Sequence, residues 1–571
     1  MKKILFSFCL ILIIPAIFPA FVNAQKYKAG PQDFTFFSSV DESNKPYAIY
    51  IPKNFDESKK YPLVVFLHGA MSNHRLGLRR VFGEGNIQGP AFGTQGFVPP
   101  QTDLEATRFY PELKDVDYIV AAPFARGTAG YQGIPEQDIF DMLADIKSKF
   151  NIDEDRMYLT GLSMGGGGTL WIGLTHPDMW AAIAPVCPAP PNEANILAGN
   201  AINIPVHLFV GDRDGLMATA NDWKAKFDAN NVKVEYVIYP GIAHNSWEYA
   251  YEDGFIFDWF AQFKRNPYPD EVKFTTQSFK YDKAYWVKID NLTPGVETSM
   301  NAKFTGGNNL EVVTSNVEAF TLNLNGHSQF NSGVAINIKI DGKSFKVKSP
   351  DAVSFSKENG SWVNKKFTPG RFSKQKGAEG PLSAALSSNH IYVYGTLGDP
   401  SREEMQSRQA EAAYAADWAF DRSFIGRIMI FPRSLADNGV RQSDIETSNL
   451  VLFGTAATNS LIAKYSDELP VQLNEDARDY GLVYIYPMNG HYVLINSGLP
   501  WWTPPSKTEG QGGLNISSLS GRGSSLNAFG DFILFKGTPD NVIWQGKFDN
   551  NWVLPAEAVA KLKASGAVTV K

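Results

Sequence analysis

Apolar runs and amphipathic stretches alternate along the first half of the chain. Short apolar runs predict strands at 47–51, 63–67, 118–122, 157–160, 181–185, 206–210 and 234–239. The run 63–67 (LVVFL) is apolar at every position, which is typical of a strand buried on both faces. Helical spacing predicts helices at 137–150, from 165 onward, at 218–229 and at 247–263. This alternation predicts an α/β unit with a mostly parallel sheet covered by helices.

The pattern changes near Pro267, where prolines and polar residues indicate a linker. Alternating strands without helices follow at 284–289, 299–304, 310–314, 319–324, 335–340 and 344–347, and they predict a small β-sandwich. Beyond about residue 373 the pattern is mixed again. Strands are predicted at 390–394, 427–431, 449–453 and 482–486, helices at 402–420 and 457–465, and a terminal hairpin at 532–554.

These changes divide the chain into an α/β domain at 25–266, a β-sandwich domain at 267–365 and a second, smaller mixed α/β domain at 366–571. The length of 571 residues agrees with several domains, because single cores rarely grow beyond about 300 residues. One segment of the first domain, 74–114, is long, weakly patterned and rich in glycine and proline. It is either a cover for a binding cleft or an ordinary surface insertion.

Residues 1–24 have the features of a signal peptide: Lys2 and Lys3, an apolar stretch and small residues up to Ala24. The alternative is a membrane anchor. Cleavage predicts a secreted or periplasmic protein with no integral membrane segment. Cys187 is then the only cysteine, so no internal disulfide is expected, and we predict a small buried residue there rather than a catalytic thiol.

The strongest chemical signal is Gly161-Leu162-Ser163-Met164-Gly165. A predicted strand precedes it and a glycine-rich helix start follows, which is the context of a nucleophile elbow. The small residues Gly161 and Gly165 suit the sharp turn that presents a serine at the carboxyl end of a sheet. Ser163 is therefore the predicted nucleophile.

A serine nucleophile needs a base and an acid, which in this arrangement follow in the order Ser, Asp or Glu, His. His244 lies after a strand and before a helix, so it is the predicted base. His176 is expected at a helix end and His207 in the packing of a strand. Asp214 is preferred as the acid over Asp212, because the acid follows its strand by a turn.

The oxyanion formed during acyl transfer needs backbone N–H donors. Met164, next to the nucleophile, is one predicted donor, and Ala70, in the loop after the strand 63–67, is the other. His68 is expected to orient that loop. Trp247 either forms an aromatic wall for the substrate or packs the last helix.

Cofactor signals are weak. No His-Glu-x-x-His run or complete calcium loop occurs, and the glycines 165–168 lack the lysine of a phosphate loop. We therefore expect no cofactor and no metal requirement for catalysis. The net charge of −6, without a basic run, argues against nucleic acid as a partner.

Several motifs recur together and in order. They are Leu67-His68-Gly69, Arg126-Gly127 with Gly130-Tyr131, the stretch 152–166 around Ser163, and His244-Asn245-Ser246-Trp247. Over about 41–265 the sequence resembles secreted α/β-hydrolases related to polyhydroxybutyrate depolymerases and feruloyl or acetylxylan esterases, often labelled as the prolyl oligopeptidase family (peptidase family S9). The resemblance implies acyl transfer through an acyl-serine, with Ser163, Asp214 and His244 in the triad positions. No repeating pattern typical of the prolyl oligopeptidase β-propeller precedes these motifs.

Three functions follow from these observations. The leading one is a hydrolase of carboxylic esters whose partner is a small-molecule or polymer ester. The second is a serine peptidase with the same mechanism, because a triad does not discriminate between the two bonds. The third is an inactive binding protein. The C-terminal half could contact glycans through Trp501, Trp502 or Trp362, although core packing is the expected role of these side chains.

Overall fold

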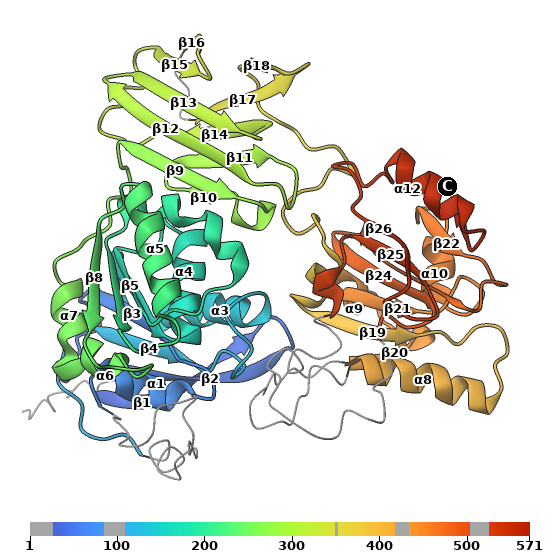
Figure 1. Ribbon diagram of the computed structural model, residues 1–571, viewed down its shortest axis with the longest axis horizontal. Helices are drawn as coiled ribbons and strands as arrows, with labels where there is room; N and C mark the ends of the chain where they lie inside the picture. Colours follow the sequence, from blue (N-terminus) through green and yellow to red (C-terminus); the bar gives the residue numbers. More distant parts are fainter. Residues whose placement is uncertain (1–26, 85–108, 349–351, 417–432, 503–524) are drawn as a thin grey trace, which may run out of the picture.

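The computed structural model describes residues 27–84, 109–348, 352–416, 433–502 and 525–571. The predicted signal peptide and the predicted strand 427–431 lie outside these residues, as do parts of the predicted helix 402–420 and of the segment 74–114. The described residues form three separate hydrophobic cores, one in each predicted unit. In Figure 1 the β-sandwich lies above the first unit, and the C-terminal unit lies beside both.

The first unit is built on an eight-stranded sheet. In spatial order its strands are β1 (Gly30–Ser38), β2 (Ser43–Ile51), β4 (Ile119–Pro123), β3 (Tyr61–Leu67), β5 (Ile152–Leu162), β6 (Ala182–Val186), β7 (Val206–Gly211) and β8 (Val234–Tyr239). The pairs β1–β2 and β2–β4 are antiparallel and the other pairs are parallel, which confirms the predicted mostly parallel sheet. All seven residues of β3 are buried, as its apolar run predicted.

The order of the strands places a topological switch point at β3. The chain passes from β3 to β4 on one side and then returns to β5 on the other side. In open α/β sheets, ligands bind outside the carboxyl ends of the strands at such a switch point. The residues Gly69 and Ala70 follow β3, and Ser163 follows β5.

Helices cover both faces of this sheet (Figure 1). They are α1 (His74–Val81), α3 (Ile134–Lys149), α4 (Met164–Thr175), α5 (Met217–Ala229), α6 (Trp247–Ala250) and α7 (Phe255–Phe260). The single helix predicted at 247–263 is wrong. Asp253 and Gly254 have positive φ values of 51° and 69°, and this left-handed backbone separates α6 from α7.

The interpretation of 74–114 as a weakly patterned segment missed α1 at its start. The side chain of Asn73 accepts a hydrogen bond from the N–H of Leu76 and so caps the helix, while Leu76, Leu78 and Val81 are buried. Because Arg79 and Arg80 interrupt the apolar positions, the helical spacing is difficult to recognise in the sequence. The question whether the rest of the segment covers a cleft falls on 85–108, outside the described residues.

A buried ion network fixes the loop after β4. The guanidinium of Arg126 is fully buried and donates hydrogen bonds to Asp138 on α3 and to Asp41 between β1 and β2. In the same loop, the carbonyl of Phe124 lies 2.8 Å from Nε2 of His68. The network thus holds the loop that contacts the segment after β3.

The second unit is a sandwich of two five-stranded sheets, as predicted. One sheet contains β10 (Lys283–Ala284), β11 (Val287–Asn291), β14 (Ala319–Asn323), β17 (Ala352–Glu358) and β18 (Ser361–Val363). The other contains β16 (Lys343–Val347), β15 (Ile336–Ile340), β13 (Asn309–Ser315), β12 (Thr298–Gly306) and β9 (Glu271–Thr276). The strands β9, β17 and β18 were not predicted, and Tyr285, with a φ of 52°, interrupts the strand predicted at 284–289.

The third unit has a mixed seven-stranded sheet, which confirms a second α/β unit. Its strands are β20 (Arg433–Ala436), β19 (His390–Tyr394), β21 (Asn449–Phe453), β24 (His491–Gly498), β23 (Tyr480–Met488), β25 (Phe532–Lys536) and β26 (Val542–Gly546). Its longer helices are α8 (Arg402–Ala416), α9 (Gln442–Thr447), α10 (Ser460–Tyr465) and α12 (Ala556–Ala564), and β22 (Val471–Leu473) pairs with β27 (Val568–Val570). The terminal hairpin ends at Gly546, earlier than predicted.

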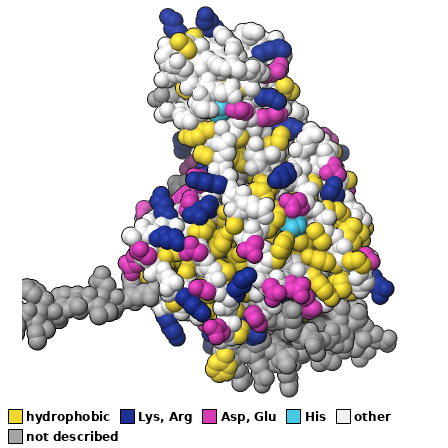
Figure 2. Space-filling view, turned by 90° about the vertical axis from the view of Figure 1, so that its left-hand side faces the viewer, with side chains coloured by type: hydrophobic (Ala, Val, Ile, Leu, Met, Phe, Trp, Pro, Cys, Tyr) yellow, Lys and Arg dark blue, Asp and Glu magenta, His cyan; other side chains and the backbone are white. Residues whose placement is uncertain are grey.

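The edge of the first sheet at β8 is partly apolar. Figure 2 shows this side of the molecule, with hydrophobic side chains gathered over its lower part. Ile238, Tyr249 and Phe255 are 40%, 42% and 46% exposed there. Within the described part of the chain, none of the helices has the length and apolar character needed to span a bilayer.

Candidate active site

Ser163 lies in a tight turn between β5 and α4. Its φ of 55° and ψ of −118° place a non-glycine residue in a strained backbone conformation. Its N–H donates to the carbonyl of Val186 at 2.9 Å, and its carbonyl accepts from the N–H groups of Gly167 and Ala189. These bonds hold the turn, so the hydroxyl stands at the carboxyl end of the sheet.

The glycines around Ser163 are required by close backbone contacts. A Cβ atom on Gly165 would lie 2.0 Å from the carbonyl oxygen of Leu67, and one on Gly161 would lie 2.5 Å from the carbonyl oxygen of Gly165. Side chains at these positions would push β3 and α4 away from the turn. The predicted need for small neighbours of Ser163 therefore has a direct steric basis.

The structure brings Ser163, His244 and Asp214 together. Nε2 of His244 lies 2.9 Å from Oγ of Ser163. Nδ1 of the same ring lies 2.9 and 3.1 Å from the two carboxylate oxygens of Asp214. Such an arrangement allows the imidazole to take the serine proton while the carboxylate orients the ring and balances its charge.

Asp212 does not reach His244 by a hydrogen bond. It is exposed, and its carboxylate accepts a hydrogen bond from the N–H of Gly241 at 2.7 Å, so it holds the turn at the start of the His244 loop. Asp214 is only 6% exposed and also accepts from the N–H of Leu216. The geometry therefore favours Asp214 over Asp212, as the chain order did.

Close approach of the β7 turn to the His244 loop depends on Gly211. A Cβ atom on Gly211 would lie 2.2 Å from the carbonyl oxygen of Ile242 and 2.5 Å from that of Ala243. The N–H of Arg213 donates to the same Ile242 carbonyl at 2.9 Å. These contacts set the distance between the acid and the base.

The surroundings of His244 favour its protonated form. Burial by itself lowers the pKa of His244, but its hydrogen bonds with Asp214 and Cys187 and the charge of Asp214 outweigh burial and raise the pKa well above the ordinary 6.5. A stabilised imidazolium can hold the proton of Ser163 while a covalent intermediate forms. Stabilisation of the imidazolium favours proton transfer from Ser163 to a ring that starts neutral, which is the step that general base catalysis requires.

One predicted oxyanion donor, Met164, directly follows Ser163, and the other, Ala70, follows a residue that lies next to the elbow. Met164 is the first residue of α4, and Gly69 is so close to the elbow that a Cβ atom on it would lie 3.5 Å from Cβ of Ser163. Neither the Met164 N–H nor the Ala70 N–H has a hydrogen-bond partner among the described residues. Both are therefore available for an oxyanion, and this role stays a prediction.

The other histidines have structural surroundings. His68 is buried and its two ring nitrogens lie 2.8 Å from the carbonyls of Gly69 and Phe124, which suits its predicted role in orienting the loop. His176 caps the end of α4, and His207 packs against Phe209. Burial lowers the pKa of both His176 and His207 to about 4, so both are neutral near pH 7.

The predicted aromatic contacts divide into two groups. Trp247 is half-buried beside the base, with its ring perpendicular to that of His244 at 5.4 Å, so either predicted role is open to it. Trp362, Trp501 and Trp502 are 6%, 0% and 8% exposed. These three side chains belong to the cores of the sandwich and the C-terminal unit, as core packing predicts. Glycan contact by the C-terminal half stays a prediction.

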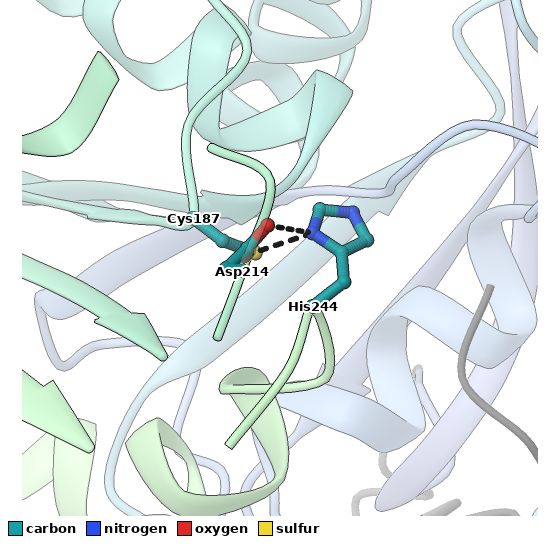
Figure 3. A group of neighbouring side chains, drawn as sticks. All are labelled: Cys187, Asp214 and His244. Atoms are coloured by element: carbon teal, nitrogen blue, oxygen red, sulfur yellow. Dashed lines mark hydrogen bonds and ion pairs between the residues drawn. The ribbon is translucent and has the colours of Figure 1, made fainter. Parts of the chain in front are cut away.

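Cys187 is the residue near the site that sequence reasoning missed. It is fully buried, as predicted, but its sulfur and the ligand atoms of Asp214 and His244 all lie within 4.8 Å of one another (Figure 3). Cys187 directly follows β6, between the strands that precede Ser163 and Asp214. Its position at a predicted strand end was the one available signal.

Comparisons with known proteins agree with this description of the first unit. The Dienelactone hydrolase family matches residues 115–252. The curated dipeptidyl-peptidase 5 of Aspergillus fumigatus is 28% identical over an alignment of 159 residues, and the match covers 25% of this chain and 18% of that protein. The chain therefore matches less than a fifth of the length of this relative.

Solved structures similar to the chain include a thermostable esterase and the ferulic acid esterase Fae1A from Anaeromyces mucronatus. The first is 23% identical with a TM-score of 0.32, and the match covers 41% of this chain and 63% of that one. The second is 20% identical with a TM-score of 0.30, covering 41% and 92%. The sheet topology and the family match show that the first unit has an α/β-hydrolase fold, which confirms the predicted fold class, and the family match supports a hydrolase.

Proposed function

We propose that the protein is a serine hydrolase that cleaves carboxylic esters through an acyl-serine intermediate. The observation that carries the proposal is the continuous hydrogen-bonded path from Oγ of Ser163 through the ring of His244 to the carboxylate of Asp214. The match to the Dienelactone hydrolase family supports an ester as the bond, because a lactone is a cyclic ester.

Each residue has a defined part in the reaction. Oγ of Ser163 attacks the acyl carbon and its proton passes to Nε2 of His244, while Asp214 stabilises the imidazolium. The N–H groups of Met164 and Ala70 hold the oxyanion. The imidazolium then gives its proton to the departing alcohol. In the second half, water attacks the acyl-serine, its proton passes through His244 to Oγ, and the free acid leaves.

A serine peptidase of the same mechanism is the second candidate. The stretch similar to dipeptidyl-peptidase 5 favours it. Turnover of p-nitrophenyl and feruloyl esters, compared with that of proline-containing peptides, separates the two functions. Ester turnover with no peptide cleavage supports the esterase, and the reverse result supports the peptidase.

The role of Ser163 is tested with a fluorophosphonate probe, which labels an activated serine. We expect labelling of the native protein and none of Ser163→Ala. The matched control is Ser148→Ala, which removes an exposed hydroxyl from α3. Absence of labelling in the folded native protein would overturn the proposal and favour the inactive binding protein.

Export of the chain is also a proposal, because it depends on residues 1–24. Sequencing of the mature N-terminus from the natural producer tests it. We expect the first residue to be Gln25, directly after Ala24. An intact N-terminus on a membrane-bound protein would instead support the anchor.

A further inference from the structure

Three side chains with metal-binding atoms, one of them the imidazole of the proposed base, meet at one place behind Ser163. The sulfur of Cys187, a carboxylate oxygen of Asp214 and a ring nitrogen of His244 lie within 4.8 Å of one another. Figure 3 shows Cys187 and Asp214 on the same side of the ring, both facing its Nδ1 atom. The three residues follow β6, β7 and β8, three neighbouring strands of the sheet.

The three segments are held independently of any ion, and the loop that carries His244 is held by the N–H of Arg213, which donates to the carbonyl of Ile242 at 2.9 Å. The N–H of Cys187 donates to the carbonyl of Phe209 at 2.7 Å. The carboxylate of Asp214 accepts from the N–H of Leu216 at 2.9 Å. A ligand set on three fixed segments is largely preformed, so little ordering is needed before an ion binds.

The spacing of the ligand atoms suits a small tetrahedral ion. Zinc bonds of about 2.0–2.3 Å place neighbouring ligand atoms roughly 3.3–3.7 Å apart. The contact of Nδ1 with the carboxylate, at 2.9 and 3.1 Å, must widen by a few tenths of an ångström. The sulfur already lies within 4.8 Å of both other ligand atoms. The side chain of His244 is 17% exposed while that of Asp214 is 2% exposed, so an ion reaches the group from the side of the imidazole.

The donor atoms select the class of ion. A thiolate, an imidazole and a carboxylate together match zinc, whereas magnesium and calcium require mainly oxygen ligands. Three protein ligands leave a fourth position for water, which is the usual composition of an accessible zinc site.

We propose that Cys187, Asp214 and His244 form a site for a thiophilic divalent cation, best matched by zinc, and that zinc bound there reversibly inhibits the hydrolase. The inhibition rests on the proposed function, whereas the binding does not. The cation takes the place of the Nδ1 proton, and that proton and the thiol proton of Cys187 are released to water. The charge of the cation next to the ring opposes a second positive charge on Nε2, so His244 no longer accepts the proton of Ser163.

Binding is tested first without reference to activity. The full chain is freed of metals with a chelator and titrated with Co²⁺, which gives a thiolate-to-cobalt charge-transfer band when sulfur is a ligand. We expect the band in the native protein and in Ser163→Ala, and its loss in Cys187→Ser. A native protein without the band, or a band that persists in Cys187→Ser, would overturn the site.

Inhibition is tested with zinc added to an ester hydrolysis assay, each variant being compared with its own zinc-free turnover. Zinc is expected to inhibit the native protein, EDTA to restore it, and Cys187→Ser to weaken the inhibition by roughly tenfold or more. The matched control is His74→Gln, which removes another histidine near a carboxylate, 3.8 Å from Asp33, and should leave the zinc sensitivity unchanged. Equal sensitivity of the native protein and Cys187→Ser contradicts the inhibition. A cysteine-dependent cobalt band in a protein without hydrolase activity upholds the site and overturns the proposed function.

Discussion

Replacement of Asp214 by asparagine isolates the electrostatic part of the proposed mechanism. The substitution keeps the shape of the side chain and removes its charge. In the native protein the carboxylate lies 2.9 Å from Nδ1 of His244. At an effective dielectric constant near 20, a unit charge pair at this distance attracts by about 6 kcal/mol. This energy is available only when His244 is charged, which is the state that follows proton transfer from Ser163.

Loss of that energy from the transition state lowers the rate by about 10⁴-fold, at 1.36 kcal/mol for each factor of ten. We therefore expect Asp214→Asn to lower kcat for a p-nitrophenyl ester by roughly 10³–10⁴-fold. Because Asp214 raises the pKa of His244, its replacement also moves the acid limb of the pH–rate profile to lower pH. Circular dichroism and the thermal midpoint must show that the fold is retained.

The matched control is Asp212→Asn, two residues away. Its amide oxygen can still accept the hydrogen bond from Gly241, so kcat should stay within about threefold of the native value. A folded Asp214→Asn variant with more than a tenth of native turnover would contradict the electrostatic role of Asp214. A large loss confined to Asp212→Asn would transfer the acid role to that residue.

Three further predictions test the packing and the independence from metals. In Gly165→Ala the new Cβ would lie 2.0 Å from a backbone atom, so the free energy of unfolding should fall by about 3 kcal/mol or more in denaturant titrations. The control Gly173→Ala, in the same helix, meets only a side chain at 3.2 Å and should change the free energy of unfolding by less than about 1 kcal/mol. Arg126→Met leaves the buried carboxylate of Asp138 without its ion-pair partner and should cost about 3–5 kcal/mol in the same titrations. The partly exposed Arg156→Ala should cost less than about 1 kcal/mol. Prolonged dialysis against EDTA should leave ester turnover unchanged; a loss that a divalent cation restores would show that catalysis requires a metal.

The strands of the first unit were predictable because burial on both faces leaves a continuous apolar run. The run 63–67 lies within β3 (Tyr61–Leu67), and 206–210 lies within β7 (Val206–Gly211). The break between α6 and α7 was not predicted, although Asp253-Gly254 is a turn-forming pair. The apolar spacing continues through this pair, so periodicity alone does not reveal the change of backbone conformation.

The candidate site was predictable where local sequence fixes local geometry. Gly161 and Gly165 are needed because β3 lies close to the turn at Ser163. The loop before α6 places His244 within hydrogen-bonding distance of Ser163. Ala70 was predicted from its position in the loop after β3, and Trp247 from its place three residues after His244, next to which its ring lies. The neighbourhood of Cys187 depends instead on which strands are adjacent, and a single sequence does not contain that information.

The order of the strands also explains how the strained backbone at Ser163 and Cys187 is stabilised. Ser163 and Cys187 both have positive φ values, 55° and 36°, each costing of order 1–3 kcal/mol. Each N–H donates to a carbonyl of the neighbouring strand. Ser163, which follows β5, donates to Val186 of β6, and Cys187, which follows β6, donates to Phe209 of β7. The N–H of Asp212 repeats the pattern with Tyr239 of β8. Each strained turn is therefore held by its neighbour, and the same hydrogen bonds line up the ends of β5 to β8 so that hydroxyl, thiol, carboxylate and imidazole meet. A substitution that disturbs one of these turns should consequently alter the site through the adjacent strand, even where the substituted side chain touches none of the reacting groups.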